Sequence, residues 1–269
     1  MKTRLALIPA SREKLIRAIC DHLVEPMSEA KELDAIADVL ADTMDLLHRH
    51  DVGGVDDDLM TALKHLMRPV IQFGVIPADP KLRPKFVSVL IAMLASMSEW
   101  HYRLYLHGFS TEIDILDFHM EILMVFCDLV NKGDGNGGGG GGSGNHSGVF
   151  PKDWSQMLLF QNSVILKSLR LFSNTITQCF ISPHAVERQL LLNFFHCAVR
   201  FLTHEQLQLE TFSQNKRKRI ISRYKDMRRD MAWEVRQMWH ALGRNKKPFV
   251  PDLVCVFLEM NLIPQPEIR

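Results

Sequence analysis

The segment LIRAICDHLVEP, residues 15–26, shows the pattern that decides the fold class. Its apolar residues recur every three or four positions, which places them on one face of an α-helix: Leu15, Ile16, Ile19, Cys20, Leu23 and Val24. We expect Pro26 to end that helix, because proline lacks the amide hydrogen that the next turn requires. Ser28 is then expected to cap a second helix.

The same apolar spacing continues toward residue 132. A second helix is predicted to end before Gly53, and a third begins with three carboxylates, Asp56–Asp58, which favour a helix N-terminus. After three prolines, one long apolar segment runs from Phe86 to about Leu106. Thr111 and Asp114 have the spacing of a capping box at the start of another helix, although the box usually has Glu or Gln in place of Asp114.

Beyond residue 150, the pattern predicts helices near 153–179, 184–203, 213–242 and 251–261. Ser182 and Pro183 are expected to cap and begin the second of these, and Gly243 is expected to end the third. No segment alternates apolar and polar residues for long enough to predict a strand. Helix pairs recur about every 40–50 residues, the period of armadillo and HEAT repeats. We therefore expect an all-α fold, an armadillo/HEAT-like helical-repeat superhelix.

A glycine-rich run divides the chain. Ten of its 15 glycines lie in GDGNGGGGGGSGNHSG, residues 133–148. Such a run cannot offset its ordering entropy by burial, so it is predicted to be a disordered linker. A phosphate-binding loop is rejected because no Gly-Lys-Ser/Thr follows it. The predicted organisation is a helical-repeat segment at 1–132, the linker at 133–148, and a second helical-repeat segment at 149–269.

Composition limits the class of protein. The 269 residues are 46% hydrophobic and 23% charged, which is typical of a soluble globular protein. No apolar stretch is long enough to cross a membrane, and five cysteines without CxxC spacing favour a reducing compartment such as the cytoplasm. The net charge of +1 hides an asymmetry: residues 1–150 have 14 basic against 21 acidic side chains, and residues 151–269 have 18 against 10.

Histidines do not have the spacing of metal ligands. His48 and His50 flank Arg49 and so lie on different faces of a helix, and His101 and His107 are six positions apart. We interpret the first pair as a solvated helix end.

Two other candidates for chemistry have simpler interpretations. Asp56–Asp58 resembles part of a calcium loop but lacks its glycine and distal glutamate. Cys197 follows His196, yet adjacent residues point apart on a helix, so Cys197 is interpreted as a small buried apolar residue. The sequence therefore predicts no catalytic residue, no metal ligand and no cofactor.

One surface is unusual. Between Lys216 and Arg244, ten basic residues stand against three acidic ones, with apolar and aromatic residues interleaved. One interpretation is a solvated helix whose arginine stems cover the core; the other is a docking face for an acidic protein or an anionic lipid. Nucleic acid is not expected, because no nucleic-acid-binding motif accompanies the charge. The candidate docking residues are Lys216, Arg217, Lys218, Arg219, Arg223, Arg228 and Arg229.

Several motifs follow the glycine run: VFPKDW (149–154), QNSVILK (161–167), FLT (201–203), LQLE (207–210), DMRR (226–229), FVP (249–251) and LEMNLIP (258–264). As a set they resemble those of the DOCK (dedicator of cytokinesis) proteins. The resemblance is looser before the run, for example at Trp100-His101-Tyr102, and weak up to about residue 55. The glycine run looks like an insertion relative to the family. The motifs are most similar to the Rac-directed, ELMO-associated branches.

The resemblance implies the central helical-repeat region of a guanine nucleotide exchange factor for Rho-family GTPases. In that family this region lies between a lipid-binding domain and a catalytic domain, so we expect a non-enzymatic scaffold segment of a longer protein. A Rac-type small GTPase, an ELMO-type adaptor and recruitment from the cytoplasm to the plasma membrane are implied for the parent protein. The alternatives are a stand-alone helical adaptor that docks through the basic face and, less favoured, a helical enzyme.

Overall fold

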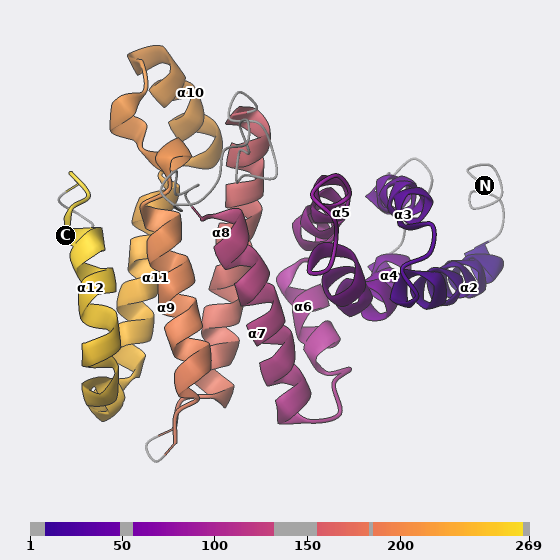
Figure 1. Cartoon of the computed structure of the whole chain (residues 1–269), viewed down its shortest axis with the longest axis horizontal. Helices are drawn as coiled ribbons and strands as arrows, with labels where there is room; N and C mark the ends of the chain where they lie inside the picture. The colour runs from indigo at the N-terminus through magenta and orange to yellow at the C-terminus, as the bar shows by residue number, and fades with distance from the viewer. Residues whose placement is uncertain (1–8, 49–55, 132–154, 183–184, 266–269) are drawn as a thin grey trace, which may run out of the picture. The chain divides into compact units, whose positions relative to one another are not determined.

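The computed structural model describes residues 9–48, 56–131, 155–182 and 185–265. These residues form helices throughout, apart from turns and one isolated bridge between Ile181 and Val186 (Figure 1). The prediction of an all-α helical-repeat fold is confirmed. The chain divides into two compact units, unit 1 (Met1–Glu121) and unit 2 (Ile122–Arg269). The predicted linker Gly133–Gly148 lies outside the described residues, so the three-part division at that run stays a prediction.

In unit 1, the main packing contacts join a helix to the next helix but one in the chain. The pairs α2 with α4 and α3 with α5 make the main contacts, an arrangement typical of helical repeats. Fully buried side chains such as Cys20, Leu63 and Phe86 fill the space between them. The helices are α2 (Pro9–Ser28), α3 (Leu33–His48), α4 (Asp56–Pro69), α5 (Arg83–Ser96), α6 (Glu99–Leu106) and α7 (Glu112–Leu129), of which α7 continues into unit 2.

The end of α2 differs from the prediction. Pro26 lies inside the helix, which continues to Ser28. The Ser28 hydroxyl donates to the Glu25 carbonyl at 2.7 Å, so Ser28 belongs to the last turn of α2 and does not cap α3. A proline this close to the end removes one backbone hydrogen bond without breaking many others. The chain then reverses through Ala30 and Glu32, both with positive φ.

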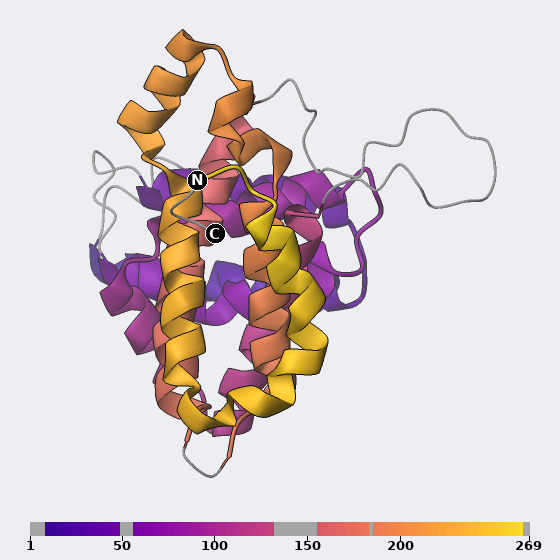
Figure 2. The same ribbon diagram turned by 90° about the vertical axis from the view of Figure 1, so that its left-hand side faces the viewer.

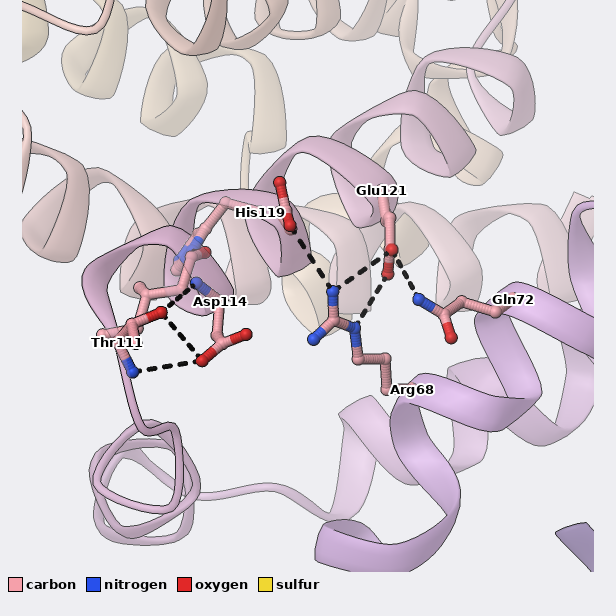
Figure 3. A network of polar contacts seen from close by, with 8 residues as sticks. Arg68, Gln72, Thr111, Asp114, His119 and Glu121 are labelled. Atoms are coloured by element: carbon pink, nitrogen blue, oxygen red, sulfur yellow. Dashed lines mark hydrogen bonds and ion pairs between the residues drawn. The ribbon is translucent and has the colours of Figure 1, made fainter.

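The predicted apolar segment from Phe86 to Leu106 is two helices. It breaks at Met97, and Ser98 caps α6 by accepting from the backbone N–H of His101 at 3.2 Å. The predicted capping box is confirmed at the start of α7. The Thr111 N–H donates to Asp114 at 3.1 Å, and the Asp114 N–H donates to the Thr111 hydroxyl at 3.2 Å (Figure 3).

A π-helical turn, Val70–Val75, follows α4 and packs against α5. Gly74 lies in this turn, where an added Cβ would stand 2.4 Å from the ring of Phe86. Only glycine allows this close approach.

A polar network joins α4, the π-helical turn and α7 inside unit 1 (Figure 3). The Arg68 guanidinium contacts Glu121 at 3.4 Å and Asp117 at 3.9 Å, and the Gln72 amide donates to Glu121 at 2.6 Å. The network ties the charged groups of α4 and α7 together beside the apolar core.

His119 is buried on α7 and stays neutral. Its Nδ1 donates to the Ile115 carbonyl at 2.6 Å, so its Nε2 accepts from the Tyr102 hydroxyl at 2.8 Å. Burial lowers the pKa of His119 to about 4, because the charged imidazolium would lose its hydration. This histidine therefore acts as a structural hydrogen-bonding group.

In unit 2 the long helices run side by side, and α10 lies beyond one end of them (Figures 1 and 2). α11 packs against α8 and α9, and α12 packs against α9. Aromatic rings fill the interior: Phe126 stacks on Phe172, and Phe195 contacts both Trp239 and Phe257 edge to face. The helices are α8 (Ser155–Cys179), α9 (Arg188–Leu202), α10 (Gln214–Tyr224), α11 (Met227–Ala241) and α12 (Val250–Asn261).

Two boundaries in unit 2 differ from the prediction, and one is confirmed. α9 begins at Arg188, because Ser182 forms a tight turn with Ala185: the Ala185 N–H donates to the Ser182 hydroxyl at 2.9 Å. The single helix predicted for 213–242 is two helices, separated at Lys225, which has φ 60°. Gly243 has φ 53° directly after the C-cap of α11, as predicted.

Candidate functional site

The candidate docking residues fall on two helices with different environments. Five of the seven lie on α10: Lys216, Arg217, Lys218, Arg219 and Arg223. The other two, Arg228 and Arg229, lie in the first turn of α11. We call the five residues of α10 the basic surface.

α10 leaves the basic surface open to solvent. Ile220 is its only buried residue, and the helix lies beyond one end of the long, side-by-side helices of unit 2 (Figure 2). Lys216 lies over the ring of Phe212 at 4.1 Å, and Arg223 lies over the ring of Tyr224 at 5.3 Å. These contacts orient two cations on aromatic rings without neutralising their charge.

The positive charge of α10 is uncompensated within the helix, whose sequence QNKRKRIISRY contains no acid. Across the part of the chain that the structure describes, no carboxylate lies within ion-pair distance of these five side chains. Several like charges on one exposed helix create a local positive potential that attracts anionic surfaces.

Arg228 does not belong to this surface. It is 2% exposed, and its two terminal nitrogens donate to the two carboxylate oxygens of Glu210 at 3.0 and 2.6 Å. The Arg228 guanidinium lowers the pKa of Glu210, so the pair stays ionised. Arg228 is therefore a structural residue that fixes the start of α11 to the segment before α10.

Arg229 remains exposed, but its position is set by a cap. Asp226 accepts from the backbone N–H groups of Arg228 at 3.2 Å and Arg229 at 3.3 Å, and it also accepts from the Gln265 amide at 2.7 Å. Asp226 thus fixes the first turn of α11 and joins it to the segment after α12.

A second exposed surface, on α12, is apolar. Val250, Val254, Leu258 and Leu262 follow one another at intervals of four residues and are all exposed, Leu258 by 59% and Leu262 by 79%. The first three of them also line a hollow of about 260 Å³, together with Trp239, Leu253 and Phe257. We call these four residues the apolar ridge. The four-residue spacing of these residues is visible in the sequence, but their exposure is not.

The other candidates from the sequence have structural roles or stand apart. His101 is part of the Ser98 cap, whereas His48 ends α3 with its Nδ1 3.4 Å from the Ser96 hydroxyl. His50 lies outside the described residues. Cys197 is fully buried, as its interpretation required. Among the residues that the structure describes, no three His, Cys, Asp or Glu side chains come close enough together to hold a metal.

The family model of the "Dedicator of cytokinesis (DOCK) TPR region" matches residues 1–269. The chain belongs to the DOCK family. The match includes the residues before 55, where the motifs showed little resemblance, because a family model sums weak similarity along the whole segment. It also agrees with the helical-repeat packing of both units.

Individual DOCK proteins match along the same length. The chain is 29% identical to mouse dedicator of cytokinesis protein 4 and 28% identical to the human protein 4, over all of this chain and 14% of each relative. It is 27% identical to mouse dedicator of cytokinesis protein 3, over 99% of this chain and 13% of that protein. The chain thus spans about a seventh of the length of these DOCK proteins. In the described helices, no segment is long and apolar enough to cross a membrane.

Proposed function

We propose that this chain is a non-catalytic scaffold segment of a DOCK-type guanine nucleotide exchange factor. In this proposal the parent protein activates a Rac-type small GTPase in cytoskeletal signalling, with an ELMO-type adaptor as a partner. The helical segment sets the spacing between a membrane-binding domain and a catalytic domain, and the protein moves between the cytoplasm and the plasma membrane.

The observation that carries the proposal is the packing of unit 2 together with the full-length match to a DOCK helical region. Fully buried rings such as Phe172 on α8 and Phe194 and Phe201 on α9 hold these two helices in fixed positions. A core packed in this way resists deformation, which a spacer requires. The exposed apolar ridge of α12 also supports the proposal. A helical repeat normally buries such a face against a neighbouring repeat, as expected of a segment that works within a longer scaffold.

The first test measures release of a fluorescent guanine nucleotide from a Rac-type GTPase. We expect this chain in molar excess to leave the release rate at its intrinsic value, and the longer protein with its downstream domain to accelerate release. Acceleration by this chain alone would contradict the scaffold proposal.

The second test addresses spacing. In the full-length protein, the helical segment is replaced by a flexible Gly-Ser linker. Exchange on a GTPase in solution should be unchanged, whereas exchange on a GTPase anchored to vesicles should fall. Equal loss in both assays would show that the segment supports the catalytic domain directly.

A second candidate function is docking of an acidic protein or anionic lipid surface through α10, and the uncompensated charge of the basic surface supports it. The test variant reverses Arg217, Arg219 and Arg223 to Glu. The matched control reverses three exposed cations outside α10, Arg229, Arg244 and Lys247, so that both variants have the same net charge.

Binding is measured to vesicles with and without phosphatidylserine and to an acidic polypeptide. Only the α10 variant should lose binding, and wild-type binding should weaken with salt, since charges are screened over about 8–10 Å at physiological ionic strength. Equal loss in both variants would indicate a general charge effect and exclude α10 as the docking site.

A further inference from the structure

Two cysteines from different helices of unit 2 meet in its interior. Cys127 lies near the end of α7 and Cys197 in the middle of α9, 70 positions apart in the sequence. The two thiols interact, because each is the first cause of the shift in the other's pKa. No function described above uses this pair.

A second contact places the two sulfur atoms at the same turn of α9. The Cys127 Sγ lies 4.0 Å from the carbonyl oxygen of Asn193, which is one turn before Cys197. A helical side chain covers the turn that precedes its own Cα, so the Cys197 side chain covers the turn that begins at Asn193. The thiol of Cys127 therefore approaches the position that the thiol of Cys197 occupies.

The two thiols differ in access and in charge. Cys127 is partly exposed, whereas Cys197 has no exposed surface. The interaction with Cys197 lowers the pKa of Cys127, burial opposes that shift, and the nearby Arg200 guanidinium lowers the pKa further. The interaction with Cys127 and burial both raise the pKa of Cys197. Since the thiolate is the reactive form of cysteine, Cys127 is the attacking thiol and Cys197 the one that resolves the product.

We propose that Cys127 and Cys197 are a redox-active pair that hydrogen peroxide converts to a disulfide between α7 and α9. The Cys127 thiolate attacks one peroxide oxygen, the O–O bond breaks, and hydroxide leaves to give a sulfenic acid. The Cys197 sulfur then attacks the sulfenic sulfur, the S–O bond breaks, and water leaves as the S–S bond forms. In total, two thiols lose two electrons and two protons, and one peroxide becomes two molecules of water.

The remaining cysteines provide internal references. Cys20 is buried in unit 1, where burial raises its pKa to about 12 and makes it unreactive. Cys179 and Cys255 are exposed, so the peroxide test replaces them to exclude oxidation that depends on solvent access alone. Cys20 remains as the reference for a buried, unreactive thiol.

In the test, Cys179 and Cys255 of the full chain are changed to Ser. This variant is then treated with a small excess of hydrogen peroxide. Two of the remaining thiols should disappear together, with a mass loss of two hydrogens and a peptide that links Cys127 to Cys197. Dithiothreitol should restore both thiols. Circular dichroism before treatment shows that the variant is folded.

Two single changes in that background separate the roles. In Cys197→Ala, which keeps a small apolar group in the core, peroxide should leave a Cys127 sulfenic acid that dimedone traps. In Cys127→Ser, Cys197 should stay reduced. A sulfenic acid first at Cys197, or oxidation of Cys127 to the sulfinic state in the presence of Cys197 without any link, would overturn the proposal.

A measurement without any mutation gives an independent check. In the native wild-type chain, iodoacetamide should alkylate Cys127 well before Cys20 and Cys197. Alkylation of Cys127 no faster than that of Cys20 would also overturn the proposal, because the attacking thiol would then be closed to solvent.

Discussion

α10 and α11 follow one another in the chain and both contain arginines and aromatic residues, yet their arginines lie in opposite environments. α10 buries Ile220 alone, whereas α11 buries Met227, Met231, Val235 and Met238, and also Arg228. The first helix is held to unit 2 by one apolar side chain and presents its cations to solvent. The second lies against α8 and α9 and takes a cation into the core.

A basic residue in a helical repeat can therefore lie in the core or at the surface. Whether a carboxylate is available to pair with it determines which position it takes. Arg228 is buried because Glu210 supplies a carboxylate that matches its guanidinium with two hydrogen bonds. Within the described residues, no carboxylate forms such a pair with the cations of α10, although Arg217 interacts electrostatically with Glu210. Burying these cations would therefore cost far more than leaving them hydrated. Four predictions test this contrast.

The largest effect is expected for Arg228→Ala. It removes a buried cation from its pair with the partly exposed Glu210 and leaves a cavity, so it should lower the free energy of unfolding by about 3 kcal/mol. Arg229→Ala, one position on but exposed, should change it by less than about 0.5 kcal/mol. Urea unfolding of both variants measures the difference, and equal effects would remove the distinction between the two arginines.

The next effect concerns the anchor of α10. Ile220→Ala should cost about 2 kcal/mol, because Ile220 is the only side chain of this helix in the core. Hydrogen exchange of the α10 amides should accelerate while that of the α11 amides stays unchanged. Ile221→Ala is the control, since Ile221 is 42% exposed. Faster exchange in both helices would show that α10 and α11 unfold as one unit.

A smaller, stabilising effect is expected at the break between the helices. Lys225 has φ 60° and ψ −160°, a conformation that glycine adopts without strain. Lys225→Gly should therefore raise the melting temperature and the free energy of unfolding, the latter by about 1 kcal/mol. Arg223→Gly, inside α10, should lower it by a similar amount. A loss of stability in Lys225→Gly would contradict the strain argument.

The smallest effect concerns acid. The pKa of Glu210 is lowered, mainly by its hydrogen bonds to Arg228, from an ordinary value of 4.5. Its contribution to stability is therefore complete above that pH and is lost as the pH falls through the lowered folded-state pKa. Partial exposure of Glu210 keeps the effect small. Stability measured from pH 6 to pH 3 should decline less in Glu210→Gln than in the wild type, and parallel profiles would exclude Glu210 as the group responsible.

The basic surface could be predicted from the sequence because the charged side chains of an exposed helix remain at the surface after folding. Sequence reasoning included Arg228 in error, since the helical spacing of Arg228 is compatible with either face and Glu210 lies 18 positions away. It also missed the apolar ridge and the contact between Cys127 and Cys197. Both depend on which neighbouring helix covers a given face.

The sequence by itself determined the features that depend on nearby residues. The three- and four-residue spacing determined that the chain is helical, the Thr111–Asp114 pair determined a helix start, and Gly243 determined a helix end. These features are local, because hydrogen bonds within one or two turns stabilise them. The structure showed two boundaries that the local pattern left undecided: Pro26 stays within the last turn of α2, and Lys225 divides α10 from α11. Only the tertiary structure decided that Arg228 is buried, because its carboxylate partner Glu210 lies 18 positions away and the energy of that ion pair exceeds the local preference of a single residue.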